Sequence, residues 1–410
     1  MRIAVIGGGA SGMLCSGYLA KFGHQVTLIE KNEKLGKKLF ITGKGRCNIT
    51  NDADRQALLD NIISNPKFAI SALSKFTPKD TMNFFEEKGV PLKVERGNRV
   101  FPQSDKSSDI IKALEKWLYD MGVNVLLNTE VKAVNRANSG FDVLVKGTTI
   151  SVDKVVVATG GISYPATGST GDGYKWAKEF GHSITDLRPG LNALLCKNTE
   201  KLAGLTLKNV GANIYSQDKL LCSEFGEMLF THHGVSGPII LSLCSRINKY
   251  YVKGKFNRQI ELKIDLKPAL SFEQLEARLI KDFKEKSNLD IKNLMPEYMP
   301  KALIEYVLNQ AKISQSTKCN SITIQMRENL INALKGLKFN ILDIDKIEAA
   351  IITSGGVDVK DISPKDMQSK LVPGLYFIGE VLDIDALTGG FNLQLALSSA
   401  YAMASSLENE

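Results

Sequence analysis

Three glycines and one acidic residue near the start of the sequence have the types and spacing to hold a dinucleotide. Gly7, Gly9 and Gly12 form a G-x-G-x-x-G pattern, and Glu30 closes the next apolar run. In this pattern the first glycine permits a tight turn, the second lets the backbone approach a pyrophosphate, and the third lets a helix pack closely on a strand. An acid at the end of the following strand accepts hydrogen bonds from an adenosine ribose. The sequence therefore predicts a dinucleotide without a 2′-phosphate at that ribose.

The glycine pattern depends on the elements around it, because three glycines alone also suit an ordinary turn. Residues 3–6 are apolar and predict a buried strand, residues 10–22 predict a helix that stops at Gly23, and residues 26–29 predict a second strand. This order forms a βαβ unit with parallel strands. Free N–H groups at the start of such a helix bind phosphate, so the context favours dinucleotide binding over a turn.

The remaining sequence predicts one domain that is built from two separate parts of the chain and interrupted by an insert. Buried-strand and helix patterns precede and follow the insert, whereas residues 191–265 are typical of strands and hairpins and residues 266–345 of helices. Within the helical part, Ser271 and Gln274 form a capping box. The last predicted helix, residues 391–407, contains no charge, so we expect it to be buried.

The composition is that of a globular protein without a membrane segment. The chain has 410 residues, of which 43% are hydrophobic, and no apolar run is long enough for a bilayer. The sequence begins without the pattern of a secretory leader, and its six cysteines are scattered without metal or disulfide-reductase spacing. We therefore expect a cytoplasmic protein with no membrane contact and no metal site.

The formal net charge of +8 would suit polyanionic partners, but the basic residues are spread along the chain. The nearest approach to a local excess, Lys249–Arg258, is interleaved with tyrosine and phenylalanine. This is a weak feature of nucleic-acid binding. A merely solvated surface is the simpler interpretation, so nucleic acid is not the partner that we expect.

Four further segments carry a resemblance to a known family. They are GKKLFITGKGRCNITN (36–51), VVVATGGISYPATGSTGDGY (155–174), THHGVSGP (231–238) and GLYFIGEVLDIDALTGGFNLQLA (374–396). Together with the glycine pattern they make the whole chain resemble the BaiN/YhiN-like bacterial flavoproteins, FAD-dependent oxidoreductases for which NAD(P)H is the expected electron donor. The resemblance implies an α/β fold.

The domain organisation that follows is a split Rossmann-like FAD-binding domain with an inserted domain. The FAD-binding domain would comprise residues 1–190 and 346–410. The insert would comprise residues 191–345, β-rich over 191–265 and helical over 266–345.

The resemblance also implies which residues hold FAD. The pyrophosphate would lie at the start of the first helix, the segment from Lys37 to Asn48 would run past the phosphates toward the flavin, and the Glu380 carboxylate would hold the ribityl chain. Reduced flavin carries negative charge, which the start of the helix at Phe391 would favour. The implied cofactor-binding residues are Gly7, Gly9, Ala10, Ser11, Gly12, Glu30, Lys31, Lys37, Lys38, Arg46, Cys47, Asn48, Val131, Ala158, Thr159, Gly160, Gly379, Glu380, Asp385, Gly389, Gly390, Phe391 and Asn392.

Three side chains are candidates for a catalytic proton donor: His232, His233 and Tyr164. Each has a structural alternative. The histidines also suit a strand end with backbone hydrogen bonds, and Tyr164 suits a wall of the FAD site. Cys47 has no partner thiol at redox spacing, so it is also a candidate for a packing residue.

The function that we expect is hydride transfer from NAD(P)H through flavin N5 to an unsaturated or carbonyl-bearing small molecule. The protein would orient and tune the cofactor, and the THHGVSGP segment would fold over the flavin. Two alternatives remain open. One is an RNA-associated flavoprotein related to folate-dependent tRNA-modifying enzymes, which would require a basic, aromatic-studded face on the insert. The other is a flavin-binding regulator without turnover.

Overall fold

The computed structural model describes residues 1–409, which divide into two units. Unit 1 is discontinuous and comprises Met1–Gly190 together with the segment that starts at Lys346. Unit 2 is continuous and comprises Leu191–Asp345. Each unit has a hydrophobic core of its own.

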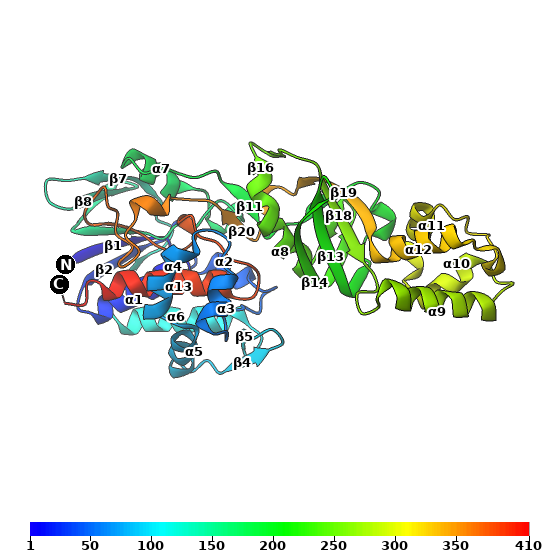
Figure 1. Cartoon of the computed structure of the whole chain (residues 1–410). Helices are drawn as coiled ribbons and strands as arrows, with labels where there is room; N and C mark the ends of the chain where they lie inside the picture. Colours follow the sequence, from blue (N-terminus) through cyan, green and yellow to red (C-terminus); the bar gives the residue numbers. More distant parts are fainter. Residues whose placement is uncertain (410) are drawn as a thin grey trace. The chain divides into compact units, whose positions relative to one another are not determined.

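A five-stranded parallel sheet forms the centre of unit 1 (Figure 1). Its strands are almost continuously apolar, and residues 3–5 of the central strand are fully buried. This is expected of a parallel sheet that is covered on both faces. In spatial order the strands are β21 (Leu375–Phe377), β10 (Lys154–Val157), β1 (Arg2–Ile6), β2 (Gln25–Ile29) and β6 (Asn124–Leu126).

The two parts of unit 1 share this sheet and the helices on it. Strand β21, from the later part, pairs in parallel with β10, from the earlier part. Helix α13 (Phe391–Ser405) packs against α1 (Ala10–Lys21), and Figure 1 shows the red and blue helices together. Helix α13 is uncharged and mostly buried, which confirms the expectation from its sequence. A discontinuous stretch of sequence therefore builds one core.

Smaller elements surround the parallel sheet. They include the antiparallel β7-β8-β9 sheet, the β3-β5-β4 sheet and the β11-β20 pair. The strands are β3 (Thr50–Asn51), β4 (Leu92–Glu95), β5 (Arg99–Pro102), β7 (Val131–Arg136), β8 (Phe141–Val145), β9 (Thr148–Val152), β11 (Arg188–Gly190) and β20 (Ile352–Ser354). The helices are α2 (Lys37–Ile41), α3 (Arg55–Asp60), α4 (Pro66–Lys75), α5 (Pro78–Glu87), α6 (Ser107–Asp120) and α7 (Asp172–Glu179).

Unit 2 contains a closed antiparallel barrel, with a group of helices between its last two strands in sequence. In spatial order its strands are β12 (Leu194–Cys196), β15 (Gly234–Ser236), β14 (Lys219–Thr231), β13 (Thr206–Ser216), β18 (Ile260–Asp265) and β19 (Leu337–Ile344). The other elements are α8 (Pro238–Ile247), β16 (Tyr251–Val252), β17 (Lys255–Phe256), α9 (Phe272–Glu285), α10 (Ile291–Leu294), α11 (Ile304–Ala311) and α12 (Ile324–Lys335).

The order of strands and helices in unit 2 corrects the expected insert at two places. The prediction of helix throughout 266–345 is wrong at β19, where Leu337, Phe339 and Ile341 are buried and the residues between them are exposed. This strand closes the barrel by pairing with β12 and β18. The β-rich part also contains helix α8, whose apolar side chains pack against the barrel strand β14.

The start of helix α9 in unit 2 has the capping box that the sequence predicts. The Ser271 hydroxyl accepts a hydrogen bond from the Gln274 N–H at 3.2 Å, and the Gln274 side chain accepts one from the Ser271 N–H at 2.9 Å. The predicted capping box at the start of α9 is therefore confirmed. None of the helices within residues 1–409 is long and apolar enough to cross a membrane.

The fully buried side chain of Gln394 joins α13 to the earlier part of unit 1. Its Oε1 atom accepts hydrogen bonds from the hydroxyls of Thr50 and Thr81 at 2.6 and 2.8 Å. Its Nε2 atom donates to the Phe76 carbonyl and to the Ser398 hydroxyl, both at 3.0 Å. Every polar atom of this amide is satisfied inside the core, so the network fixes α13 in position.

We expect Gln394→Leu to lower the free energy of unfolding of the protein by about 2–4 kcal/mol, because it leaves several buried polar groups without partners. Urea unfolding of the FAD-free protein would measure the loss. The matched control is Gln56→Leu on the exposed face of α3, which should change stability by less than about 0.5 kcal/mol. Equal effects of the two substitutions would contradict the assigned role of Gln394.

Candidate functional site

The predicted glycine turn lies between β1 and α1, where backbone segments meet closely. Gly7 has a φ of +111°, and a Cβ atom there would lie 2.5 Å from the Ala158 carbonyl oxygen. A Cβ atom on Gly12 would lie 1.9 Å from the Gly7 carbonyl oxygen. By contrast, a Cβ atom on Gly9 would meet no atom within 4 Å. Gly7 and Gly12 are therefore required by packing, whereas Gly9 borders open space.

The open space lies at the N-terminus of α1, which has the properties of an anion site. Gly9 is the N-cap residue and provides no side-chain cap, and the first turn contains no acidic residue. The N–H groups of Ala10 and Ser11 in that turn have no partner within the helix, and the helix dipole favours negative charge. The carboxyl ends of β1, β10 and β21 adjoin in the sheet, the edge at which such folds bind ligands.

Gly379 follows the end of β21 and packs against this turn. It has a φ of +72°, and a Cβ atom on it would lie 2.6 Å from the Ser11 hydroxyl oxygen. Its N–H donates to the hydroxyl of Ser399 in α13 at 3.0 Å. The structure thus brings two of the predicted motifs, one from each part of unit 1, into contact.

Glu30 lies at the end of β2 and is buried. Its Oε2 atom accepts a hydrogen bond from the Gly8 N–H at 2.7 Å, and its Oε1 atom accepts from the Asn32 N–H and side-chain amide at 2.8 and 2.6 Å. Two carboxylate oxygens offer about four acceptor positions, so one remains for a ligand. The residue therefore holds the glycine turn itself, besides being placed to meet a ribose.

Lys38 and Glu380 form the centre of a second cluster. The Lys38 ammonium donates to the two carboxylate oxygens of Glu380 at 2.9 and 2.7 Å and to the Ser163 hydroxyl at 2.7 Å. Glu380 also accepts from the Thr353 N–H at 2.9 Å. The sequence prediction missed Ser163 and Thr353, although Thr353 is a small polar residue that directly follows the apolar run 349–352.

Two other predicted cations are held by nearby side chains. Lys31 forms an ion pair with Asp172 at 2.7 Å and a hydrogen bond with Thr170. Lys37 lies 3.4 Å from Glu33, which precedes it by four residues. Both lysines are only partly exposed, and both lie within a few residues of the turn that contains Glu30.

The guanidinium group of Arg46 is paired with two carboxylates. It pairs with Glu95 and with Asp105, where the shortest N–O distance is 2.5 Å, and it lies 4.1 Å from the centre of the Phe101 ring. Its hydrogen bonds to Glu95 and Asp105 raise the pKa of Arg46 and lower those of the two carboxyls. This arrangement gives Arg46 a structural role in positioning the loop that leads to Asn48.

Three buried polar atoms in the predicted segments 36–51 and 155–174 have no hydrogen-bond partner within residues 1–409. They are Oδ1 of Asn48, Oγ1 of Thr159 and the hydroxyl of Tyr174. An unpaired buried polar group costs about 1–3 kcal/mol, and such groups are rare in folded proteins. Polar atoms of a bound dinucleotide would satisfy them, so these residues fit a ligand such as FAD.

Four other predicted residues are placed as follows. Cys47 is fully buried, which raises the pKa of its thiol to about 12, so the neutral thiol packs and is no nucleophile. Val131 is buried in β7, and Gly160 has a φ of +70° just after β10. Tyr164 is partly exposed, with a φ of +51°. Of these, only Tyr164 presents a polar side chain to the surface.

Close backbone contacts and side-chain hydrogen bonds fix the loop before α13. Gly389 and Gly390 have φ values of +128° and +100°. A Cβ atom on Gly390 would lie 2.3 Å from the Thr50 carbonyl oxygen, so this glycine is required by strand β3. The side chain of Asn392 bonds the N–H and carbonyl of Ala386 at 2.9 and 2.8 Å. The N-cap of the buried helix that begins at Phe391 is Gly390, which leaves the N–H groups of the first turn uncapped by a side chain.

Asp385 is a buried carboxyl in the same loop. It is 1% exposed, its Oδ1 atom accepts from the Ser354 hydroxyl at 3.1 Å, and its Oδ2 atom has no partner within hydrogen-bond distance in residues 1–409. Burial raises the pKa of this carboxyl to about 6. A carboxyl with a pKa of about 6 can bind and release a proton at mildly acidic pH.

The two predicted catalytic histidines belong to unit 2. His232 and His233 form the two-residue turn between β14 and β15, and both are exposed. Their ring centres are 6.5 Å apart, and the His233 carbonyl accepts a hydrogen bond from the Cys196 N–H at 3.0 Å. Tyr164 and the predicted FAD-binding residues belong to unit 1. The donor assignment stays a prediction.

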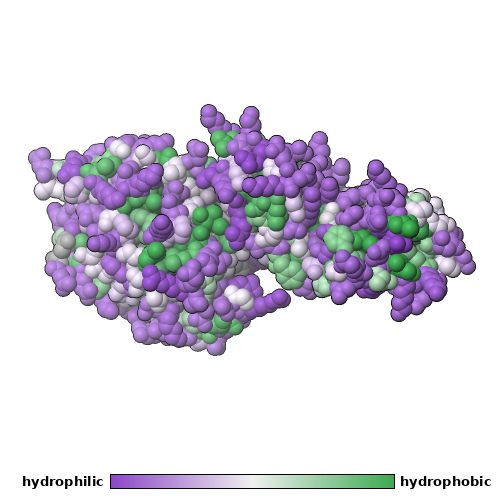
Figure 2. Space-filling view, viewed as in Figure 1, coloured by the Kyte–Doolittle hydropathy of each residue, from purple (hydrophilic) through white to green (hydrophobic). Residues whose placement is uncertain are grey.

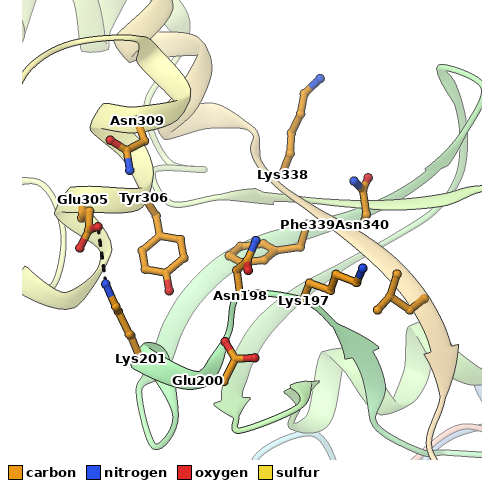
Figure 3. Close-up of a pocket in the computed structure, with 11 residues that line it drawn as sticks. Lys197, Asn198, Glu200, Lys201, Glu305, Tyr306, Asn309, Lys338, Phe339 and Asn340 are labelled. Atoms are coloured by element: carbon orange, nitrogen blue, oxygen red, sulfur yellow. Dashed lines mark ion pairs between the residues drawn. The ribbon is translucent and has the colours of Figure 1, made fainter.

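Unit 2 also contains a cleft of about 640 Å³ that includes none of the predicted site residues (Figure 3). Its lining combines lysines, amides, two carboxylates and the rings of Tyr306 and Phe339. Lys201 and Glu305 form an ion pair across it at 3.7 Å. This composition suits a polar ligand. The lining residues are Lys197, Asn198, Glu200, Lys201, Glu305, Tyr306, Asn309, Lys338, Phe339, Asn340 and Leu342.

Comparison with known sequences finds one family and several relatives that span the chain. Residues 1–406 match the family described as HI0933-like protein Rossmann domain. The chain is 32% identical to the ribosomal RNA dihydrouridine synthase of Escherichia coli, over 98% of this chain and 97% of that protein. It is 30% identical to the 3-dehydro-bile acid delta(4,6)-reductase of Clostridium scindens, over 98% and 97% of the two chains.

Solved structures with a similar fold include redox enzymes. One is the 3-ketosteroid delta1-dehydrogenase of Sterolibacterium denitrificans, with a TM-score of 0.54, 13% identity and 99% coverage of both chains. Another is a flavocytochrome c3 fumarate reductase, with a TM-score of 0.51, 17% identity and coverage of 100% of this chain and 78% of that one. At this identity the likeness establishes the fold.

The buried carboxyl of Asp385 predicts a pH dependence of stability. Its folded pKa of about 6 lies above the unfolded value of about 3.9. The fold therefore favours the protonated form, and stability should fall as the pH rises from about 4 to about 6 and then level off. Asp385→Asn should remove this fall and stabilise the FAD-free protein at pH 7 by about 2–3 kcal/mol.

Urea unfolding at several pH values would test this expectation, with Asp52→Asn at an exposed position as the control. Parallel stability curves for Asp385→Asn and the unchanged protein would show that the carboxyl ionises without cost in the fold.

Proposed function

Because the chain belongs to the HI0933-like Rossmann family and has the FAD-binding fold of flavin-dependent oxidoreductases, we propose that it is an FAD-dependent reductase of carbon–carbon double bonds conjugated to a carbonyl. NAD(P)H is the electron donor in this proposal. Bound FAD would supply the hydride chemistry, accepting a hydride from NAD(P)H and donating it from N5.

The observation that carries the reaction class is the chemistry shared by two full-length relatives. One is named for making dihydrouridine, which is uridine with its ring double bond reduced. The other is named for reducing double bonds of a 3-dehydro bile acid, which carries a ketone. In both names the reduced bond is conjugated to a carbonyl. A hydride adds to the carbon distant from the carbonyl, a proton adds to the adjacent carbon, and NAD(P)⁺ is released.

The residues of unit 1 support FAD as the cofactor. The uncapped N-terminus of α1 and the open space at Gly9 suit the pyrophosphate. Glu30 has one hydrogen-bond acceptor position left for the ribose. The buried polar atoms of Asn48 and Thr159 that have no partner within residues 1–409 would be satisfied by polar atoms of FAD. Glu380, paired with Lys38, would bind the ribityl chain. We propose the full set of predicted cofactor residues on this basis.

The proton would come from His232, His233 or Tyr164. An imidazole can give and regain a proton near neutral pH, and both rings are exposed at a hairpin tip. In this proposal the turn closes over the substrate and excludes water. Asp385 is a further candidate because its buried carboxyl is protonated below a pH of about 6.

A small unsaturated or carbonyl-bearing molecule is the substrate class that we expect, and the family resemblance suggests a conjugated enone. One observation favours a second candidate, a uracil base in RNA. Unit 2 contains 22 lysines and arginines against 16 aspartates and glutamates, a formal charge of +6 within a chain of +8. Most of the net positive charge therefore lies outside the predicted FAD-binding unit, as binding of a polyanion would require.

Two glycine substitutions separate cofactor binding from folding. Gly9→Ala fits the backbone, whose φ is −81°, and its methyl group would enter open space, so the FAD-free protein should keep its stability. We expect its affinity for FAD to fall roughly tenfold, about 1.4 kcal/mol. Gly12→Ala would force the backbone of the turn apart and should destabilise the fold itself.

Fluorescence titration with FAD and thermal unfolding would measure the two effects. Unchanged FAD affinity in Gly9→Ala would place the pyrophosphate elsewhere.

The proposed reaction is tested by its two half-reactions. Anaerobic NADH or NADPH should bleach the flavin absorbance of the purified protein, and an enone or a uridine-containing RNA should restore it. His232→Gln and His233→Gln, singly and together, should slow only the second step, by about 10²–10⁴-fold for the group that acts as donor.

Arg327→Gln, far along unit 2 in sequence and paired with Glu276, serves as a control with normal half-reactions. Flavin that neither nicotinamide reduces would contradict the proposed function, and unchanged reoxidation would contradict the histidine assignment alone.

A further inference from the structure

We propose that the exposed segment Lys249–Arg258 of unit 2, here called the basic hairpin, binds the phosphates of RNA. The inference rests on the second candidate of the proposed function, in which the reduced base belongs to an RNA chain. Its evidence comes from the geometry and charge of the hairpin itself.

The basic hairpin is a tight two-stranded turn. Strands β16 and β17 pair through Val252 and Lys255, so that Lys253 and Gly254 alone form the connection. Both have positive φ values, +51° and +79°, as a type I′ turn requires. Asparagine is the preferred first residue of such a turn, because its side chain tolerates this conformation. A lysine at this position is less favourable for the turn than asparagine, but it places a positive charge at the tip of the hairpin.

The cations of the basic hairpin are exposed and have no carboxylate partner. Lys249, Lys253, Lys255 and Arg258 are all exposed, and no ion pair of any of them occurs within the described part of the chain. No acidic residue lies between positions 247 and 260. Hydrophilic side chains project from the surface at β16 (Figure 2). Four unpaired positive charges repel one another, which favours a polyanionic partner.

Two carboxylates, those of Glu261 and Asp218, pair with lysines outside the hairpin, whereas a third, Asp343, is bonded to Tyr251 within it. Glu261 follows the hairpin on β18, and Asp218 lies at the tip of the β13–β14 turn. Both face Lys263, at 3.2 and 4.0 Å. The positive charge of the hairpin therefore remains available to a ligand.

Aromatic rings give the hairpin a rigid base. The Arg258 guanidinium lies 4.1 Å and the Lys249 ammonium 5.2 Å from the centre of the Tyr250 ring. Tyr251 and Phe256 form an edge-to-face pair with centres 5.3 Å apart. Cation–π contacts orient the two cations without neutralising their charge. Basic residues interleaved with aromatic rings are typical of RNA-binding surfaces.

Strand β19 connects the basic hairpin with the cleft of unit 2. The Tyr251 hydroxyl bonds Asp343 at one end of β19. Lys338 and Asn340, further along the same strand, line the cleft together with Tyr306 and Asn198 (Figure 3). Five residues of a strand span roughly 17 Å. An RNA chain whose phosphates lie on the hairpin would thus reach a cleft with amides and an aromatic ring, the groups that bind unstacked bases.

The test compares two sets of charge-removing substitutions. The hairpin set is Lys253→Asn, Lys255→Gln and Arg258→Gln, in which the first change suits the turn and keeps the fold. The control set is Lys284→Gln, Lys292→Gln and Lys301→Gln, three exposed lysines of the helical part of unit 2. Fluorescence anisotropy with a labelled single-stranded RNA that contains uridine would give the dissociation constant of the FAD-loaded protein as a function of salt.

We expect the hairpin set to weaken RNA binding at least tenfold and to lower the slope of log affinity against log salt by about 2, since each lost phosphate contact removes about 0.7 for a single strand. Lys253→Asn alone should lower the slope by about 0.7 with an unchanged melting temperature. The control set should change affinity less than twofold. Unchanged affinity in the hairpin set, or an equal loss in the control set, would overturn the inference.

Reduction of FAD by NADPH, measured in the same proteins, separates this inference from the proposed function. If FAD is reduced normally and the hairpin substitutions leave the affinity for RNA unchanged, only the proposed RNA-binding role of the basic hairpin is overturned. Absent reduction in every protein overturns the proposed reductase, while the RNA titration still decides the role of the basic hairpin.

Discussion

Unit 1 depends on a backbone contact that excludes side chains. At Gly7, Gly12 and the carbonyl of Ala158, the turn after β1, the first turn of α1 and the end of β10 approach to distances at which no Cβ atom fits. This contact seats α1 on the sheet and directs its free N–H groups to the carboxyl edge of the strands. Helix α13 then packs on α1. The anion site and the core are thus consequences of one close approach.

Local signals made part of the fold predictable. The βαβ unit and the capping box at Ser271 depend on residues that are near one another in sequence, and both are found. Strand β19 was missed although its apolar and polar residues alternate, a local strand pattern that the helical interpretation of 266–345 overlooked. Helix α8 was missed because a short apolar run suits either a buried strand or a buried helix. For α8, tertiary packing decided the secondary structure.

The candidate site shows the same division between local and distant information. The glycine turn and Glu30 were recognisable because their spacing reports the geometry of one βαβ unit. The pairing of Lys38 with Glu380 was not, since it joins residues from the two parts of unit 1. Arg46 is predicted near the phosphates, and the fold also pairs it with Glu95 and Asp105. Residue type identified the charged groups, whereas their partners emerged only from the folded chain.

The discontinuity of unit 1 also constrains how the protein is made. During synthesis β1, α1 and β10 emerge well before α13, so their apolar faces remain uncovered until that helix has been translated. Unit 2 is continuous, and its contacts are complete once Asp345 has left the ribosome. We therefore expect unit 2 to acquire its structure on the ribosome before unit 1 is complete. The nascent N-terminal segment, which contains the glycine turn, would then be the portion that depends on chaperones.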